Sequence, residues 1–183
     1  MIEKSIYERA VYGGDFRVLI TQEQIRQRIL ELGREITRDY RGKDPIVIGV
    51  LNGCFIFIAD LVRAIEIDLE IDFIKLSSYG DEKVSSGKVT VLKGIDANIT
   101  GRHVLVVEDI VDTGLSLHYM DQMFQQLRPA SLKYVTLLYK KENVKYPRTI
   151  DYVGFEIPNE FVIGYGLDHK QLLRNLPAVY ILD

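Results

Sequence analysis

The sequence contains a single cysteine, Cys54, in 183 residues. One thiol can form neither an internal disulfide nor a cysteine-rich metal site, so neither of these can stabilise the fold. The N-terminal stretch MIEKSIYERA mixes acidic and basic residues without an apolar core, and we therefore expect no secretory signal. Both observations are typical of a reducing compartment and predict a cytoplasmic protein.

Long hydrophobic runs are also missing. The longest uninterrupted run, 54–59, has six residues, whereas a membrane-spanning helix needs about 20. An excess of positive charge is missing too, because the net charge is −3 and the pI is near 5.7. Such a chain has no bulk attraction to nucleic acid or to an anionic membrane, so we expect neither as a partner.

What the sequence does contain is the composition of a soluble globular protein, 47% hydrophobic and 27% charged. No linker or repeat divides it, so residues 1–183 are predicted to form one domain. Apolar runs alternate with helical patterns, which predicts an α/β fold with a parallel sheet covered on both faces. The expected helices are 21–41, which opens on a capping box of Thr21 and Gln24, 54–65 and 115–127; the expected strands are 46–51, 69–79, 88–93, 103–107, 132–139, 152–157, 161–165 and 178–182.

Polar residues follow several of these strands directly. Asn52-Gly53 follows the first, an acidic segment follows 103–107, and Lys140-Lys141 follows 132–139. In open α/β sheets, ligands bind at the carboxyl ends of the strands. We therefore expect the three segments to form one site.

The stretch 104-VLVVEDIVDTGLSL-117 carries most of the chemical information. It sets Glu108, Asp109 and Asp112 close together after four buried apolar residues, although like charges repel. Acids in this place could bind Mg²⁺, accept hydrogen bonds from sugar hydroxyls, or act as a general acid or base. The plainer alternative is that Asp112 caps a helix and that Glu108 and Asp109 lie in a solvated turn.

The second half of this stretch is small and hydroxylated, and it opens a helix. Backbone N–H groups there, with the Thr113 and Ser116 hydroxyls, would form a cradle for a phosphate at the positive end of the helix. Acids that suit hydroxyls or a metal ion, followed by a phosphate cradle, predict a site for a sugar phosphate.

The stretch resembles the phosphoribosyl-pyrophosphate motif of type I phosphoribosyltransferases. Four further segments resemble the hypoxanthine-guanine phosphoribosyltransferases in particular: 77-SSYG-80, 140-KK-141, 152-YVGFEI-157 with 158-PNEFVIGYGLD-168, and Arg174 within 172-LLRNL-176. The resemblance runs from about residue 12 to the end. It implies a Rossmann-like parallel sheet flanked by helices, with a small hood formed by N- and C-terminal segments.

The resemblance also implies a reaction and a cofactor. A member of this family transfers the 5-phosphoribosyl group of phosphoribosyl pyrophosphate to N9 of hypoxanthine or guanine, giving IMP or GMP and pyrophosphate, in purine salvage. Mg²⁺ and cationic side chains would stabilise the departing pyrophosphate. The family commonly forms homodimers or homotetramers.

Roles for single residues follow from the same resemblance. Asp112 would be the catalytic acid or base beside purine N7, and Glu108, Asp109 and Asp168 would contact Mg²⁺ directly or through water. The residues expected to bind phosphoribosyl pyrophosphate are Gly53, Glu108, Asp109, Asp112, Thr113, Gly114, Leu115, Ser116 and Arg174.

On the purine side, Lys140 would donate to the 6-oxo group, which suits an ammonium because it carries only donors. Phe161 would stack on the base, while the backbone of Val162 and of Asp168 would read its edge. Ser78 and Tyr79 begin a polar segment, 78–88, which is expected to be a mobile loop that closes over the site.

One departure from the family pattern concerns position 52. Better-known members have Leu-Lys-Gly after the first buried strand, whereas this chain has Leu51-Asn52-Gly53. That loop offers backbone N–H groups to pyrophosphate, often through a non-proline cis peptide. Asn52 can keep this backbone role but brings no positive charge.

Other functions stay open from the sequence alone. The chain could be a phosphoribosyltransferase-like regulator that binds nucleotides without turnover, or a transferase that prefers xanthine. Alternatively, the acids could form a phosphoacceptor or phosphatase site, but this reading does not explain the Asp-Thr-Gly-Leu-Ser cradle. The sequence also leaves Cys54 as an apolar core residue rather than a nucleophile.

Overall fold

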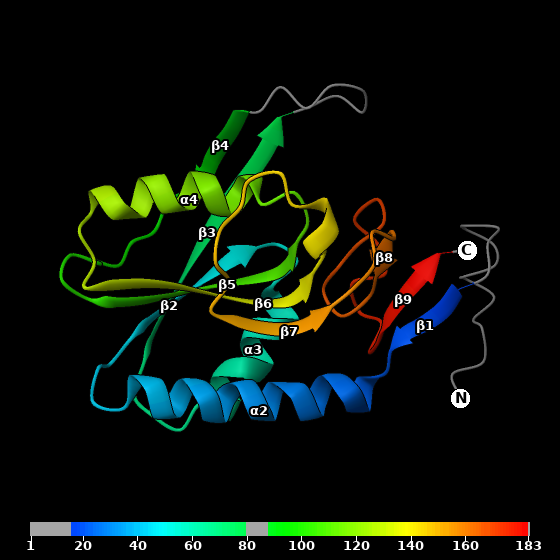
Figure 1. The fold of residues 1–183 in the computed structure, drawn as a ribbon, viewed down its shortest axis with the longest axis horizontal. Helices are drawn as coiled ribbons and strands as arrows, with labels where there is room; N and C mark the ends of the chain where they lie inside the picture. The colour runs from blue at the N-terminus through cyan, green and yellow to red at the C-terminus, as the bar shows by residue number, and fades with distance from the viewer. Residues whose placement is uncertain (1–15, 80–87, 183) are drawn as a thin grey trace.

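The computed structural model describes residues 16–79 and 88–182 (Figure 1). The central part of the expected loop, 80–87, lies outside these ranges. The elements, in chain order, are β1 (Phe16–Ile20), α2 (Gln22–Tyr40), β2 (Ile46–Leu51), α3 (Phe55–Ala64), β3 (Glu70–Tyr79), β4 (Lys88–Lys93), β5 (His103–Val111), α4 (Leu115–Gln126), β6 (Ser131–Tyr139), the 3₁₀ turn η1 (Lys141–Asn143), β7 (Tyr152–Glu156), β8 (Val162–Ile163) and β9 (Val179–Leu182).

A six-stranded sheet forms the centre of the molecule, in the order β4-β3-β2-β5-β6-β7. Neighbouring strands are parallel except for β3 and β4, which are antiparallel. Helix α4 covers one face of the sheet, and α2 and α3 cover the other (Figure 1). This confirms the expected α/β architecture.

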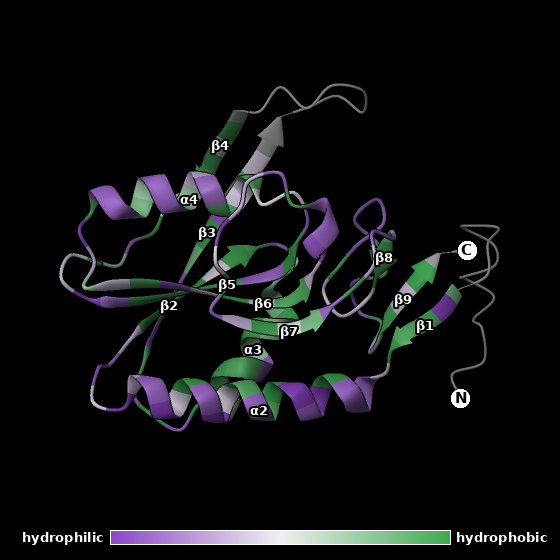
Figure 2. Ribbon diagram, in the orientation of Figure 1, coloured by the Kyte–Doolittle hydropathy of each residue, from purple (hydrophilic) through white to green (hydrophobic). Residues whose placement is uncertain are grey.

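The core consists of two apolar layers because successive side chains of a strand point to opposite faces. In β5, Leu105 and Val107 pack on the side of α2 and α3, whereas Val104 and Val106 pack on the side of α4. Figure 2 shows the same division, with apolar residues along the sheet and polar residues on the outer faces of α2 and α4. Burial on both faces explains the unbroken apolar runs in the sequence.

Helix α2 begins as expected from its sequence. The Thr21 hydroxyl accepts from the Gln24 backbone N–H, and the Gln24 side chain accepts from the Thr21 backbone N–H at 2.8 Å. The apolar stripe of the sequence, Ile25, Ile29, Leu32 and Ile36, is buried. The bounds of α3, β2, β4 and α4 also agree with the prediction to within one residue.

Three expectations about strands are wrong. Strand β5 does not end at residue 107 but continues through the acidic residues to Val111, because Glu108, Ile110 and Val111 stay paired with β6. The strand expected at 161–165 is reduced to Val162–Ile163, since a turn follows at once. Strand β1 was not expected, and its marginal length and mixed residues gave no clear strand signal.

A second, smaller sheet forms a hood beside the central one. Its order is β1-β9-β8, and both pairings are antiparallel. The hood lies at the end of the central sheet to which the arrowheads of β5, β6 and β7 point (Figure 1). N- and C-terminal segments thus build the hood that the sequence predicted. Within the described part of the chain, no helix has the length and apolar character needed to cross a membrane.

Candidate active site

The carboxyl ends of β5, β6 and β7 are aligned by their hydrogen bonds. Val111 pairs with Tyr139, and Tyr139 pairs with Glu156. Beyond the pairs, the Lys140 N–H donates to the Val111 carbonyl at 2.9 Å, and the Ile157 N–H donates to the Tyr139 carbonyl at 2.9 Å. The segments that follow these three strands therefore start at one level of the sheet.

Glu108 and Asp109 are not side by side in a loop but point to opposite faces of β5. Glu108 is 7% exposed. Burial, with a smaller contribution from Asp109, raises the pKa of Glu108 to about 8. Burial also raises the pKa of Asp109 to about 6, against backbone N–H groups and Arg174, which lower it. The strand therefore holds two carboxyl groups that burial keeps from ionising freely.

The Asp112 carboxylate is held by the segment that follows β6. Lys140 Nζ donates to one of its oxygens at 2.9 Å, and the Asn143 amide donates to the other. The Lys140 side chain is 9% exposed and that of Asp112 is 43% exposed. Asp112 is not a helix cap, because α4 has Gly114 as its N-cap and no side-chain cap. This excludes the plain interpretation of that acid.

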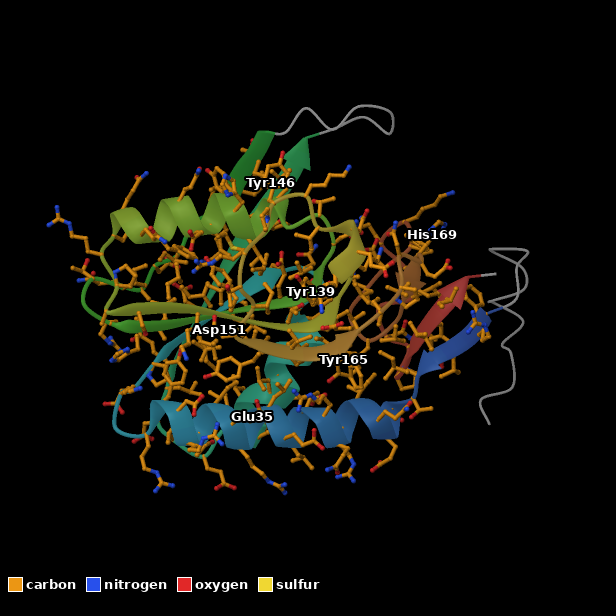
Figure 3. The ribbon with its side chains drawn as sticks, in the orientation of Figure 1. Glu35, Tyr139, Tyr146, Asp151, Tyr165 and His169 are labelled. Atoms are coloured by element: carbon orange, nitrogen blue, oxygen red, sulfur yellow. The ribbon has the colours of Figure 1, made fainter. Side chains whose placement is uncertain are left out.

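Helix α4 starts at Leu115, shortly after Asp112, and the Leu115 N–H donates to the Thr113 hydroxyl at 3.4 Å. Gly114 adopts a φ of 81°, and a side chain there would collide with the Tyr146 carbonyl. The Thr113 carbonyl is fixed by the N–H groups of Lys145 and Tyr146, at 2.9 and 3.0 Å. Since the first N–H groups of a helix have no intrahelical partner, the start of α4, with Leu115 and Ser116, can receive a phosphate. Figure 3 shows Tyr146 beside this start.

The loop after β2 approaches Asp109 closely. The Leu51–Asn52 peptide bond is cis, as the family resemblance suggested. A Cβ atom on Gly53 would collide with the Asp109 carboxylate, and a Cβ atom on Gly166 would collide with the Gly53 carbonyl. Gly166 also has a φ of 101°, which favours glycine. These glycines thus let the loop after β2, the acidic strand and the 164–168 segment meet.

Asp168 and Arg174 form an ion pair next to this contact, with 2.7 Å between Asp168 Oδ1 and Arg174 Nη2. Arg174 also donates to the Gly166 carbonyl at 2.8 Å, and Asp168 accepts from the Gln171 N–H at 2.7 Å. Arg174 is close enough to lower the pKa of Asp109. The guanidinium is therefore oriented at the edge of the loop that contains Gly53.

Phe161 directly precedes β8 in the hood, and Val162 is the first residue of that strand. The Phe161 ring is 51% exposed, whereas Val162 is 5% exposed and pairs with Ile181 of β9. The His169 ring packs edge-on against Phe161, with 5.5 Å between the centroids. Figure 3 places His169 in the loop beside the hood. An exposed aromatic residue beside an apolar strand is available to stack on a ligand.

The structure thus brings together most of the predicted residues around the strand ends. Ser78 and Tyr79 end strand β3, and their side chains are outside the described structure. Cys54 is fully buried, and burial raises the pKa of its thiol, in agreement with a core role. Asn143 was missed from the sequence, although its place three residues after Lys140 in the polar run 140-KKEN-143 was a usable signal.

The carboxylates of the candidate site could bind a metal ion only if a substrate or water supplied further ligands. Within residues 16–79 and 88–182, no three His, Cys, Asp or Glu side chains lie close enough to hold a metal ion on their own. Mg²⁺, however, is commonly bound by one or two carboxylates together with substrate phosphates and water. Asp109 lies against the loop that contains Gly53, and Asp168 is close enough to affect the pKa of Asp109, whereas Glu108 points to the other face of β5.

Comparison with known proteins agrees with this geometry. The family model described as "Phosphoribosyl transferase domain" matches residues 19–170. A hypoxanthine-guanine phosphoribosyltransferase of Bacillus subtilis (strain 168) is 45% identical over 166 residues, which is 91% of this chain and 92% of the relative.

Solved structures give the same result. A crystal structure of a hypoxanthine-guanine phosphoribosyltransferase from Bacillus anthracis has a TM-score of 0.87 at 48% identity and covers 91% of this chain and 98% of its own. That of a hypoxanthine phosphoribosyltransferase from Staphylococcus aureus has a TM-score of 0.88 at 41% identity, with 91% of both chains covered. The chain therefore belongs to the hypoxanthine-guanine phosphoribosyltransferase family.

Proposed function

We propose that this chain is a pentosyltransferase of purine salvage. It moves the 5-phosphoribosyl group of phosphoribosyl pyrophosphate to N9 of hypoxanthine or guanine and releases pyrophosphate. The observation that carries the proposal is the contact between Asp112 and Lys140. It links the phosphate cradle at the start of α4 to the segment that faces the hood, so that one site has a sugar-phosphate side and a base side.

On the sugar-phosphate side, the 5′-phosphate binds the N–H groups at the start of α4, from Thr113 to Ser116. Glu108 and Asp109, which extend from opposite faces of β5, would reach the ribose hydroxyls directly or through water and Mg²⁺. The pyrophosphate binds the backbone of Gly53 and the guanidinium of Arg174. The fixed position of Arg174, between Asp168 and the Gly166 carbonyl, supports this assignment.

Mg²⁺ is the cofactor that suits this arrangement. Glu108, Asp109 and Asp168 would hold it, directly or through water, together with the substrate's phosphate oxygens. When bound, the ion neutralises the charge that develops on the leaving pyrophosphate. It also suits the raised pKa values of Glu108 and Asp109, because a nearby cation favours their charged forms.

On the base side, Lys140 donates to the 6-oxo group of the purine. An ammonium carries only donors, which suits an oxo acceptor. Adenine, which has an amino group there, would leave this buried donor unpaired at a cost of about 1–3 kcal/mol. Phe161 stacks on the ring, and the backbone at Val162 and Asp168 reads the 2-position.

Asp112 then acts as the general base or acid of the reaction. Its carboxylate lies beside purine N7, accepts the proton when the base attacks the sugar, and returns it in the reverse reaction. Closing of the segment that begins at Ser78 and Tyr79 keeps water from the reacting sugar. The single-domain organisation, 1–183, and a cytoplasmic location belong to the same proposal.

One assay tests the function directly. The protein is incubated with phosphoribosyl pyrophosphate and Mg²⁺, and with hypoxanthine, guanine, xanthine or adenine in separate reactions, and nucleotide formation is followed. We expect product with hypoxanthine or guanine and little with adenine. Product with xanthine alone would instead favour the xanthine-preferring transferase. If no base gives product while the pyrophosphorylated sugar binds, the chain is a nucleotide-binding regulator.

We also propose that the chain acts as a homodimer or homotetramer. Phe55 is 44% exposed and Ile71 is 46% exposed. They flank an apolar groove of about 360 Å³ that is also lined by Ile58, Val62 and Phe73. A second copy would cover this surface. Light scattering after size-exclusion chromatography gives the mass, and a monomer at micromolar concentration would contradict the proposal.

A further inference from the structure

Both oxygens of the Asp112 carboxylate accept hydrogen bonds from side chains of one short turn. Lys140 Nζ reaches Oδ2 at 2.9 Å, and the Asn143 side-chain amide donates to Oδ1. The two donors belong to the same unit, since the Asn143 N–H donates to the Lys140 carbonyl at 2.9 Å. A carboxylate with a fixed partner on each oxygen cannot rotate freely, so this turn sets its orientation.

The turn is itself anchored at both ends. On one side the Lys140 N–H is bonded to the Val111 carbonyl, at the end of β5. On the other side the N–H groups of Lys145 and Tyr146 bind the Thr113 carbonyl. The donor residues and the acid therefore keep their relative positions without depending on a ligand.

The two donors are chemically different. Lys140 carries a charge, and under the proposed function it must also serve the purine 6-oxo group. The Asn143 amide is neutral and has no such second task. If Lys140 were the only side chain holding Asp112, binding of the base would compete with the placement of the acid. A second donor removes this competition, because one oxygen stays bound while the ammonium turns toward the base.

We propose that Asn143 is a positioning residue for Asp112. It acts through the carboxylate and does not touch the substrate. Its amide holds the acid in the orientation that faces N7, and it frees Lys140 for recognition of the base. This inference rests on the proposed function, since it assigns the residue that supports the acid of that reaction.

Three variants separate this role from a purely structural one. Asn143→Ala removes the amide, Asn143→Asp keeps the shape but replaces the donor with a charged acceptor, and Asn143→Gln keeps the donor on a longer side chain. We expect Asn143→Ala to lower kcat about tenfold, with KM for phosphoribosyl pyrophosphate within about twofold of the parent. Asn143→Asp should be slower still, because a second carboxylate faces Asp112, and Asn143→Gln should recover part of the loss.

The matched control is Glu142→Gln, an exposed residue of the same turn, which should leave kcat unchanged. Thermal melts of all variants show whether each is folded at the assay temperature. If Asn143→Asp is as active as the parent or more active than Asn143→Ala, shape alone matters and the inference is overturned. An unaffected Asn143→Ala in an active enzyme overturns the inference alone. A parent without turnover on any base overturns the proposed function, and the inference with it.

Discussion

At the scale of single residues, Glu108 lies in surroundings that oppose its charge. Its folded pKa is about 8, against an ordinary value of 4.5, chiefly because of burial. The folded protein therefore binds more protons than the unfolded chain between these two pH values, so the free energy of unfolding falls as the pH rises through this range. A site acid thus destabilises the protein when its ligand is absent.

Replacement of this acid should stabilise the free protein. Above a pH of about 8, we expect Glu108→Gln to raise the free energy of unfolding by at least about 1 kcal/mol, or Tm by about 2–4 °C. Below pH 4.5 the gain should vanish, because the parent is protonated in both states. Thermal melts in a chelator at both pH values measure this. An equal rise in Tm at both pH values would show that the charge of Glu108 is not the cause. Glu142→Gln is the control.

Asp112 allows a prediction about turnover. Asp112→Asn keeps one oxygen for Lys140 or Asn143 but cannot take up a proton in the same way. We expect binding of phosphoribosyl pyrophosphate to be retained and kcat to fall by about 10²-fold or more. Calorimetry and steady-state assays measure the two effects. Asp96→Asn, at an aspartate whose side chain is 89% exposed, is the matched control. Unchanged turnover would remove Asp112 from its role.

Single residues also show what the sequence could and could not reveal. Asp112, Lys140 and Gly53 were predictable because each follows an apolar strand, and the ends of parallel strands meet. The sequence did not predict that Glu108 and Asp109 point to opposite faces of β5. Their place in the strand depends on pairing with β6, which is distant in the sequence. Asn143 was missed because its partner, Asp112, lies 31 residues away in the sequence.

At the scale of secondary structure, Asp72 fastens β4 and the segment after it to β3. One of its oxygens accepts from the N–H groups of Asp96 and Ala97, at 2.6 and 2.8 Å, and the other accepts from the Phe73 N–H. Burial alone would raise the pKa of Asp72, but these N–H groups together outweigh it and hold the pKa below the ordinary value. The ionised form is therefore the one that stabilises the edge of the sheet.

Loss of this carboxylate should weaken the sheet edge. We expect Asp72→Ala to lower the free energy of unfolding by about 1–3 kcal/mol at neutral pH, since three backbone N–H donors, two of them in part-buried hydrogen bonds, lose a charged acceptor. Because the folded pKa is lowered, this contribution is present above the ordinary value of 3.8 and is lost as the pH falls through the folded pKa. Urea unfolding at several pH values measures it. Asp68→Ala, an exposed acid just before β3, should change stability by less than about 0.5 kcal/mol.

Helices and strands were predicted best where a local sequence pattern determined their type and bounds. The capping box and apolar stripe of α2 sufficed, because they are local. Strand β1 escaped prediction and the strand expected at 161–165 was predicted too long, since β1 and β8 are short and each pairs with β9, whose position depends on the folded chain. Long-range pairing leaves little trace in a short sequence window.

For the whole molecule, the residues of the proposed site come from both the central sheet and the hood. Both sheets are joined through the chain after β7 and through the start of α2 (Figure 1). A nucleotide that contacts Asp112 and the α4 cradle on one side, and Phe161 on the other, would hold the two sheets together. Ligand binding and global stability should therefore be linked.

The linkage can be measured with product. At about 100 times its dissociation constant, IMP or GMP should stabilise the protein by about 2.7 kcal/mol, which corresponds to a rise in Tm of about 5–10 °C. AMP at the same concentration should give a smaller rise, because Lys140 lacks its oxo acceptor. Differential scanning fluorimetry with each nucleotide gives the comparison, and equal shifts for IMP and AMP would contradict the assigned role of Lys140.

The contact between Gly53 and Gly166 has a consequence for protein engineering and for evolution. The two glycines lie in separate loops: a side chain at position 166 would collide with the Gly53 carbonyl, and one at position 53 would collide with the Asp109 carboxylate. A change in the backbone of one loop would disturb its contact with the other, so the effects of substitutions in the two loops should not be additive. Loops grafted from a relative to alter base preference will function when 51–53 and 164–168 are exchanged as a matched pair, and will fail when one is transplanted alone.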